Sequence, residues 1–179
     1  TTELGLKSDL FNNTLRMNAT LFKNTWEDYQ FYLVYNPGNP ANLFASLVNL
    51  PEAESIGAEL DVSWNISSTL RVNMGVAWLE TEVTNGALDT TGVPSNILSG
   101  FQNQVQTGNN LTNAPKWSAN LSLLKQIELS DSEIALSIHY NYLGKHIHQL
   151  AGNYSNTWIA NFSERSVGLL TLNSQYVFG

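Results

Sequence analysis

The sequence predicts an all-β, antiparallel fold, and three observations support this prediction. Six stretches of the chain alternate apolar and polar residues with a period of two, the pattern of strands whose two faces meet different surroundings. No stretch of comparable length has a helical repeat. The connections between the stretches alternate between short and long, which indicates that successive strands run in opposite directions.

The predicted strands follow one another along the whole chain. A first strand precedes a short turn at Asn12 and Asn13. Six further strands carry apolar residues at every second position: Leu15 to Leu21, Ala58 to Ile66, Leu70 to Trp78, Trp117 to Leu123, Ile134 to Tyr142 and Leu170 to Phe178. The sequence therefore predicts about seven strands, each long enough for a tilted crossing of the hydrocarbon layer of a membrane.

The lengths of the connections favour a membrane barrel. Tight turns are predicted at residues 12–13, 67–68 and 130–132, and long loops at residues 36–51, 84–114 and 144–164. A sandwich gives its loops no reason to alternate in length, whereas a transmembrane β-barrel has tight turns on its periplasmic side and long loops outside. We therefore expect an antiparallel transmembrane β-barrel fragment whose long loops share one end.

Composition excludes several function classes. The 179 residues include 15 acidic and 8 basic side chains, and a formal net charge of −7 argues against a nucleic-acid partner, which requires clustered Lys and Arg. The lack of cysteine excludes disulfide scaffolds and thiolate metal sites. We find no phosphate-binding loop, catalytic triad or metal-ligand cluster in the sequence. The chain is therefore expected to be no enzyme and to hold no cofactor.

The alternation also predicts which residues meet lipid. The side chains expected to face acyl chains are Met74, Val76, Leu121, Leu123, Leu136 and Ile138, and those expected to face the lumen are Asn73, Asn120, Ser122 and Ser137. Aromatic residues are expected to form a girdle at each interface. The outer girdle is predicted at Trp26, Tyr29, Phe31, Tyr32, Trp78, Trp117, Tyr140 and Tyr142, and the inner girdle at Phe11, Trp64, Tyr176 and Phe178.

Several motifs resemble those of TonB-dependent outer-membrane receptors. Residues 2–7 read TELGLK, residues 15–22 read LRMNATLF and residues 26–30 read WEDYQ, in the order and spacing of that family. Residues 53–60, which read AESIGAEL, resemble the family's entry into the following strand. Asn113-Ala114-Pro115 and the stretch from Leu170 to Phe178 are similar to its downstream pattern. The resemblance covers nearly the whole chain.

This resemblance implies that residues 1–179 form one partial barrel domain. The family folds as a 22-stranded barrel around an N-terminal plug, so seven strands are expected to be a fragment without plug and C-terminal strand. The implied location is the outer membrane of a Gram-negative bacterium. The implied partners are the lipid bilayer, the TonB complex through the missing N-terminal part, and a small-molecule ligand such as a ferric siderophore.

Candidate ligand-binding residues lie in the long outer loops, because strand residues are committed to lipid on one face and to the plug on the other. The segment from about Thr84 to Ala114 is long, low in charge and rich in hydrogen-bonding side chains, and Phe101 offers it an aromatic contact. Tyr35, His146 and His148 lie on the flanking excursions. Because His is a common metal ligand, the pair could contact a metal chelate; the alternative is an ordinary polar loop.

A second function remains open from the sequence. The same strands and Asn-rich loops suit a secreted β-sandwich that binds carbohydrate or acts as an adhesin. A signal peptide and a plug-like domain upstream would favour the receptor over this alternative.

Overall fold

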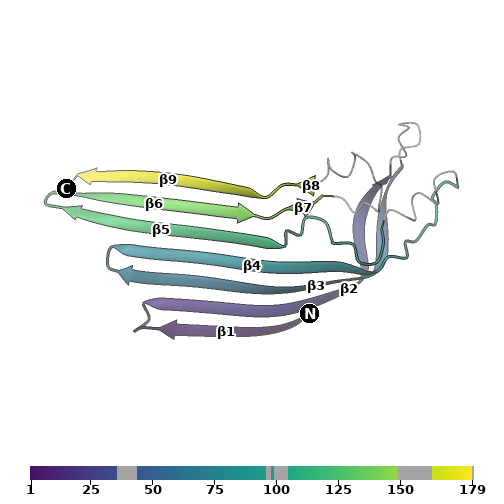
Figure 1. Ribbon diagram of the computed structural model, residues 1–179, viewed down its shortest axis with the longest axis horizontal. Coiled ribbons are helices and arrows are strands. Elements are labelled where there is room, and N and C mark those ends of the chain that lie inside the picture. The colour runs from purple at the N-terminus through teal and green to yellow at the C-terminus, as the bar shows by residue number, and fades with distance from the viewer. Residues whose placement is uncertain (36–43, 96–97, 99–104, 149–162, 179) are drawn as a thin grey trace.

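In the computed structural model, seven strands form one antiparallel sheet in the order β1-β2-β3-β4-β5-β6-β9 (Figure 1). The strands are β1 (Thr2–Leu10), β2 (Leu15–Tyr35), β3 (Phe44–Ser67), β4 (Leu70–Asn85), β5 (Trp117–Leu129), β6 (Ser132–Leu143) and β9 (Val167–Phe178). A separate two-stranded ribbon pairs β7 (His146–Ile147) with β8 (Ser163–Glu164). The structure describes all residues except 36–43, 96–97, 99–104, 149–162 and 179.

The sheet is a simple meander, because each strand of the seven pairs with its neighbour along the chain. The prediction of about seven antiparallel strands is therefore confirmed. The described strands form one extended sheet and not two packed sheets, so the sandwich alternative has no support. In the part of the chain that the structure describes, no helix is long and apolar enough to cross a membrane.

Tight turns connect the strands at one end of the sheet. Between β1 and β2, Phe11, Asn12 and Asn13 all have positive φ angles, of 51°, 55° and 64°. Asn adopts this left-handed conformation more readily than other non-glycine residues, which explains the two Asn residues at this point. The amide of Thr14 closes the turn by donating to the carbonyl of Phe11 at 3.2 Å.

The register aligns residues of one kind in rows that cross all seven strands. One row is entirely apolar and contains Leu10, Leu15, Trp64, Val72, Leu123, Ile138 and Leu172. The adjacent row is entirely polar and contains Asp9, Arg16, Ser63, Asn73, Ser122, His139 and Thr171. Because adjacent rows point to opposite faces, the sheet has one apolar and one polar face.

The β2–β3 hairpin extends beyond the other strands and bends out of the sheet at its outer end (Figure 1). Asp28 has a φ of 53°, and the ladder skips it and Pro51 between the pairs Glu27–Glu52 and Tyr29–Leu50. Pro51 has no N–H to donate, so the pairing is interrupted where the backbone changes direction.

Two details of the prediction are wrong at this hairpin. The long loop expected over residues 36–51 is shorter, since β3 already begins at Phe44. Trp26, Tyr29 and Phe31 lie inside β2 and not at its end, and Phe31 is buried among the hydrophobic residues of the outer part. These three aromatic residues therefore belong to a small core and not to an interfacial girdle.

Candidate functional site: the polar face and the outer loops

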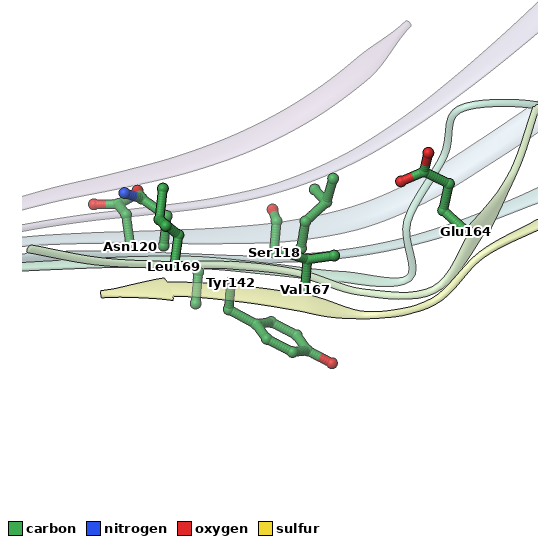
Figure 2. A pocket seen from close by; sticks show the side chains of 9 residues that line it. Ser118, Asn120, Tyr142, Glu164, Val167 and Leu169 are labelled. Carbon is green, nitrogen blue, oxygen red and sulfur yellow. The ribbon is translucent and has the colours of Figure 1, made fainter. Parts of the chain in front are cut away.

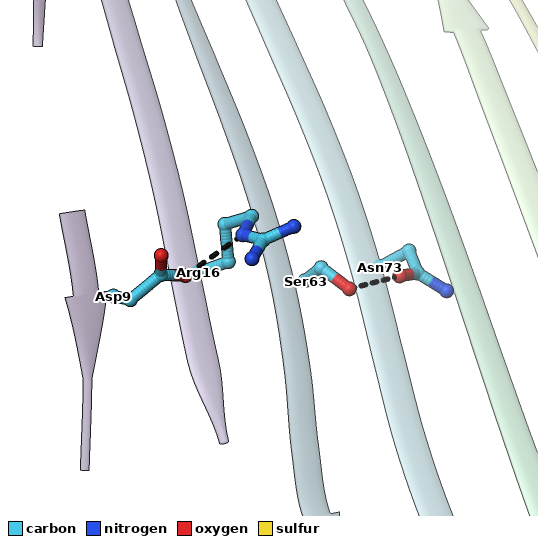
Figure 3. A network of polar contacts seen from close by, with 4 residues as sticks. All are labelled: Asp9, Arg16, Ser63 and Asn73. Atoms are coloured by element: carbon cyan, nitrogen blue, oxygen red, sulfur yellow. Dashed lines mark hydrogen bonds and ion pairs between the residues drawn. The ribbon is translucent and has the colours of Figure 1, made fainter. Parts of the chain in front are cut away.

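The polar face carries hydrogen bonds that run across the strands (Figure 3). The Arg16 guanidinium donates to Asp9 at 2.7 Å, and the Ser63 hydroxyl donates to the Asn73 carbonyl oxygen at 2.8 Å. Each partner sits directly opposite the other in the ladder, so the sheet register itself brings the groups together. This face offers donors and acceptors to an aqueous or protein-filled interior.

The apolar face ends in charged residues at its outer side. Lys23 pairs with Glu54 at 2.7 Å, and Lys116 pairs with Glu80 at 3.4 Å, all four being solvent-accessible. On the inner side Lys125 extends to the hydroxyl of Thr69 at 2.8 Å.

These charges bound an apolar band of the height that a bilayer requires. On the inner side, Lys125 lies opposite Leu70 of β4. Glu80 follows Leu70 by about ten residues on the same strand, so the inner and outer charges are ~33 Å apart along the strand. At a tilt of about 40° this becomes a band about 25 Å tall, the height of the lipid-facing band of membrane barrels. Met74 and Leu121 pair within this band, on the face predicted to meet lipid, whereas Asn73 and Ser122 pair on the opposite face.

A shallow hollow of about 470 Å³ lies on the polar face near the outer ends of β5, β6 and β9. In Figure 2, Ser118, Asn120 and Leu169 rise on one side of the sheet and Tyr142 points to the other. Glu164 of the β7–β8 ribbon stands at the outer rim of the hollow. The hollow combines amide and hydroxyl groups with apolar walls, which suits a ligand of mixed polarity.

The connection from β4 to β5 folds onto the outer end of β4. The backbone of Val83 exchanges hydrogen bonds with Gly108 and Asn109 at 2.9 and 2.8 Å, and the Leu111 amide donates to the Thr81 hydroxyl at 3.0 Å. These bonds bring loop side chains over the strand. The resulting outer core contains the buried residues Phe31, Val48, Leu50, Ala53, Val83, Val105 and Leu111.

Another part of this connection is fixed by Asp89. Its carboxylate accepts a hydrogen bond from the amide of Thr91 at 2.9 Å. This backbone bond, together with a side-chain bond from Thr91, holds the pKa of Asp89 below its usual value. The carboxylate therefore stays ionised and the turn stays closed at neutral pH.

The candidate ligand residues fall into two groups. Phe101 lies outside the described residues, and for Tyr35 the structure describes only the backbone, which pairs with Phe44 at the end of the β2–β3 hairpin. His146 and His148 are described in full. Their rings meet edge to face, with centroids 4.9 Å apart.

The histidine pair has partners that the sequence analysis did not identify. Glu164, opposite His146 in the β7–β8 ladder, places its carboxylate 3.2 Å from Nε2 of His148. Nδ1 of His148 lies 2.7 Å from the side-chain oxygen of Asn113, and Nδ1 of His146 lies 3.1 Å from the carbonyl of Gly144. The period-two spacing of the histidines was visible in the sequence; the return of the chain at Glu164 was not.

The fold and its two faces define the wall of a transmembrane β-barrel, with tight turns at one end and structured loops at the other. The family model for the TonB-dependent receptor-like β-barrel matches residues 1–177. The chain therefore belongs to this family, whose members are outer-membrane proteins of Gram-negative bacteria. No curated protein sequence matches the chain.

Two solved structures share the fold. The ferric preacinetobactin receptor BauA of Acinetobacter baumannii is 20% identical with a TM-score of 0.62, over 97% of this chain and 22% of its own. The siderophore receptor PiuA of the same species is 17% identical with a TM-score of 0.58, over 99% of this chain and 21% of its own. The chain thus spans about a fifth of the length of these receptors.

Proposed function

We propose that this chain forms part of the wall and outer loops of a receptor that imports a scarce solute, using energy delivered by the TonB complex. The row of polar residues across all seven strands is the observation that carries the proposal. A continuous polar face behind an apolar face suits a wide barrel with a filled or hydrated lumen. The TonB complex would act through the N-terminal part of the receptor.

A ferric siderophore is the proposed solute. The two structurally similar proteins are described as receptors for ferric preacinetobactin and for a siderophore, which supports this choice. The hollow bordered by Asn120, Asn141 and Leu169 adds support, because siderophores combine polar chelating groups with less polar backbones. Vitamin B12, nickel or a glycan would use the same kind of wall.

Deletion of the full-length gene tests the proposal directly. The deletion strain is grown on a panel of single iron sources, with heme, ferric citrate and chemically distinct siderophores presented one at a time. We expect growth to fail on one siderophore, and uptake of that siderophore labelled with radioactive iron to require both the receptor and TonB. Normal growth on every iron source would contradict iron transport, and uptake without TonB would contradict the mechanism.

The β4–β5 connection is the proposed place of ligand contact. Residues 95–103 are replaced by a short Gly-Ser linker, which retains Val93 and Val105, the two ends that pack in the outer core. We expect ligand affinity to fall at least tenfold, about 1.4 kcal/mol, with surface expression unchanged. Unchanged affinity in an assembled receptor would assign recognition to other loops or to the plug.

A further inference from the structure

We propose that His146, His148 and Glu164 form a binding site for a divalent transition-metal ion of the zinc type. Each residue offers one ligand atom, and the three atoms lie within 4.8 Å of one another. The site belongs to the protein itself and does not depend on which solute the receptor imports.

The β7–β8 ribbon explains why these three side chains converge. His146 opens β7 and His148 directly follows this short strand, and the centroids of their rings lie 4.9 Å apart. Glu164 is the direct cross-strand partner of His146. The paired positions of the ribbon, His146 and Glu164, and the residue that directly follows β7, His148, thus present three ligands close together.

Hydrogen bonds at the Nδ1 atoms orient both imidazole rings for metal binding through Nε2. The Gly144 carbonyl can only accept, so Nδ1 of His146 carries the proton and Nε2 keeps its lone pair. The side-chain oxygen of Asn113 acts in the same way on Nδ1 of His148. Metal-binding histidines usually donate their second ring N–H to such an oxygen, which fixes the ring and the tautomer.

The arrangement leaves two acceptors face to face. In this tautomer, Nε2 of His148 and the carboxylate of Glu164 both present lone pairs across 3.2 Å, so a cation must lie between them, either a proton or a metal ion. The separation is close to the ~3.3 Å expected between two ligands of a tetrahedral ion with bonds of 2.0–2.1 Å. His146 offers the third ligand atom, within 4.8 Å of the other two.

The ligand set selects the class of metal. Two imidazoles and one carboxylate suit zinc, cobalt, nickel and copper, whereas magnesium and calcium require oxygen ligands. Three protein ligands leave a fourth position for water or for a donor atom of a bound molecule. The cluster borders the hollow on the polar face, because Glu164 also lines the hollow.

The test uses the full-length receptor purified in detergent, stripped of metal and supplied with no solute. Zinc binding is measured by equilibrium dialysis with metal analysis, and cobalt binding by its visible absorption. We expect the wild-type receptor to bind one zinc ion more than the double variant His146→Gln/His148→Gln. Cobalt should give tetrahedral absorption only in the wild type, and excess magnesium or calcium should not displace either metal.

Two further variants separate a metal site from an ion pair. His139→Gln removes the other histidine of this chain, which lies on β6, and should bind zinc like the wild type. Asn113→Gly removes the oxygen partner of His148 at a residue whose φ of 54° glycine tolerates, and should weaken zinc binding about 10- to 100-fold. Equal zinc content in the wild type and the double variant, with both assembled, would show that only a proton bridges His148 and Glu164.

Discussion

The spanning part of the sheet and the outer part around the β2–β3 hairpin are stabilised in different ways. In the described chain, every buried hydrophobic residue belongs to the outer part. In the spanning part the apolar side chains are not buried; Leu121 and Ile138, on inner strands of the sheet, are each 38% exposed. The spanning part therefore needs lipid on one face and lumenal contents on the other, whereas the outer part has a hydrophobic core of its own.

The largest expected loss of stability comes from a substitution in the outer core. Leu50 is fully buried there, so Leu50→Ala should reduce the local free energy of unfolding by about 2–5 kcal/mol. Hydrogen exchange of the Val83 and Leu111 amides should accelerate while exchange in the inner halves of the strands stays unchanged. Leu47→Ala, at a position 60% exposed on the same strand, is the control and should have little effect. Faster exchange throughout the barrel would show that the two parts do not unfold separately.

In the spanning part, the stability cost of an arginine substitution should depend on the face of the sheet that carries it. Leu121 lies between Trp117 and Lys125 near the centre of the apolar band, so Leu121→Arg should cost roughly 2–4 kcal/mol. Asn120→Arg should cost much less because its side chain joins the polar face. Denaturant unfolding of the receptor in liposomes measures both. Equal costs for the two variants would contradict the assignment of the faces.

Two buried threonine hydroxyl groups on β4 allow a comparison in which the expected effects on stability are smaller. The Thr81 hydroxyl accepts from the Leu111 amide, so Thr81→Val leaves a buried N–H unpaired and should cost about 1–3 kcal/mol. Among the residues that the structure describes, the buried Thr84 hydroxyl has no hydrogen-bond partner, so Thr84→Val should be neutral or stabilising. Hydrogen exchange in the outer part measures the loss of stability in each variant. A larger loss for Thr84→Val than for Thr81→Val would contradict these roles of the two hydroxyl groups.

The smallest expected effect concerns pH. Folding lowers the pKa of Asp89, so its contribution is fully present above the ordinary value of 3.8 and is lost as the pH falls through the lower folded value. Protonation weakens the Asp89 carboxyl group as an acceptor for the Thr91 amide, so the protection of that amide relative to its intrinsic exchange rate should fall in acid. Asp89→Asn should abolish this pH dependence, whereas an unchanged acid response in the variant would assign it to another group.

The sequence predicted the spanning part because one physical cause acts along every strand. Each face meets a single environment, so period-two alternation marks Leu70–Trp78 and Trp117–Leu123 as clearly as the structure does. The outer extension escaped prediction because apolar and polar residues do not alternate regularly over residues 44–50 and Pro51 interrupts the pattern. Leu47 is apolar yet 60% exposed, next to the buried Val48, so apolar character does not mark the buried face here.

The histidine cluster was only half predictable. His146 and His148 are close in sequence, and their spacing already indicates one face of a strand. Glu164 and Asn113 join them through cross-strand pairing and through the hydrogen bond from the Asn113 amide to the Ile147 carbonyl at 2.7 Å. Such contacts between distant residues depend on how loops pack, for which a single sequence has no periodic signal.

The meander has a consequence for the order of assembly. Inner turns of two to four residues join β1 to β2, β3 to β4 and β5 to β6, whereas about thirty residues separate β4 from β5. Closing the longer segment costs about 2 kcal/mol more in chain entropy. Three hairpins therefore form first, each from its inner turn, and their edges join later. We therefore expect the long outer segments, and not the inner turns, to limit how quickly neighbouring hairpins join into one sheet.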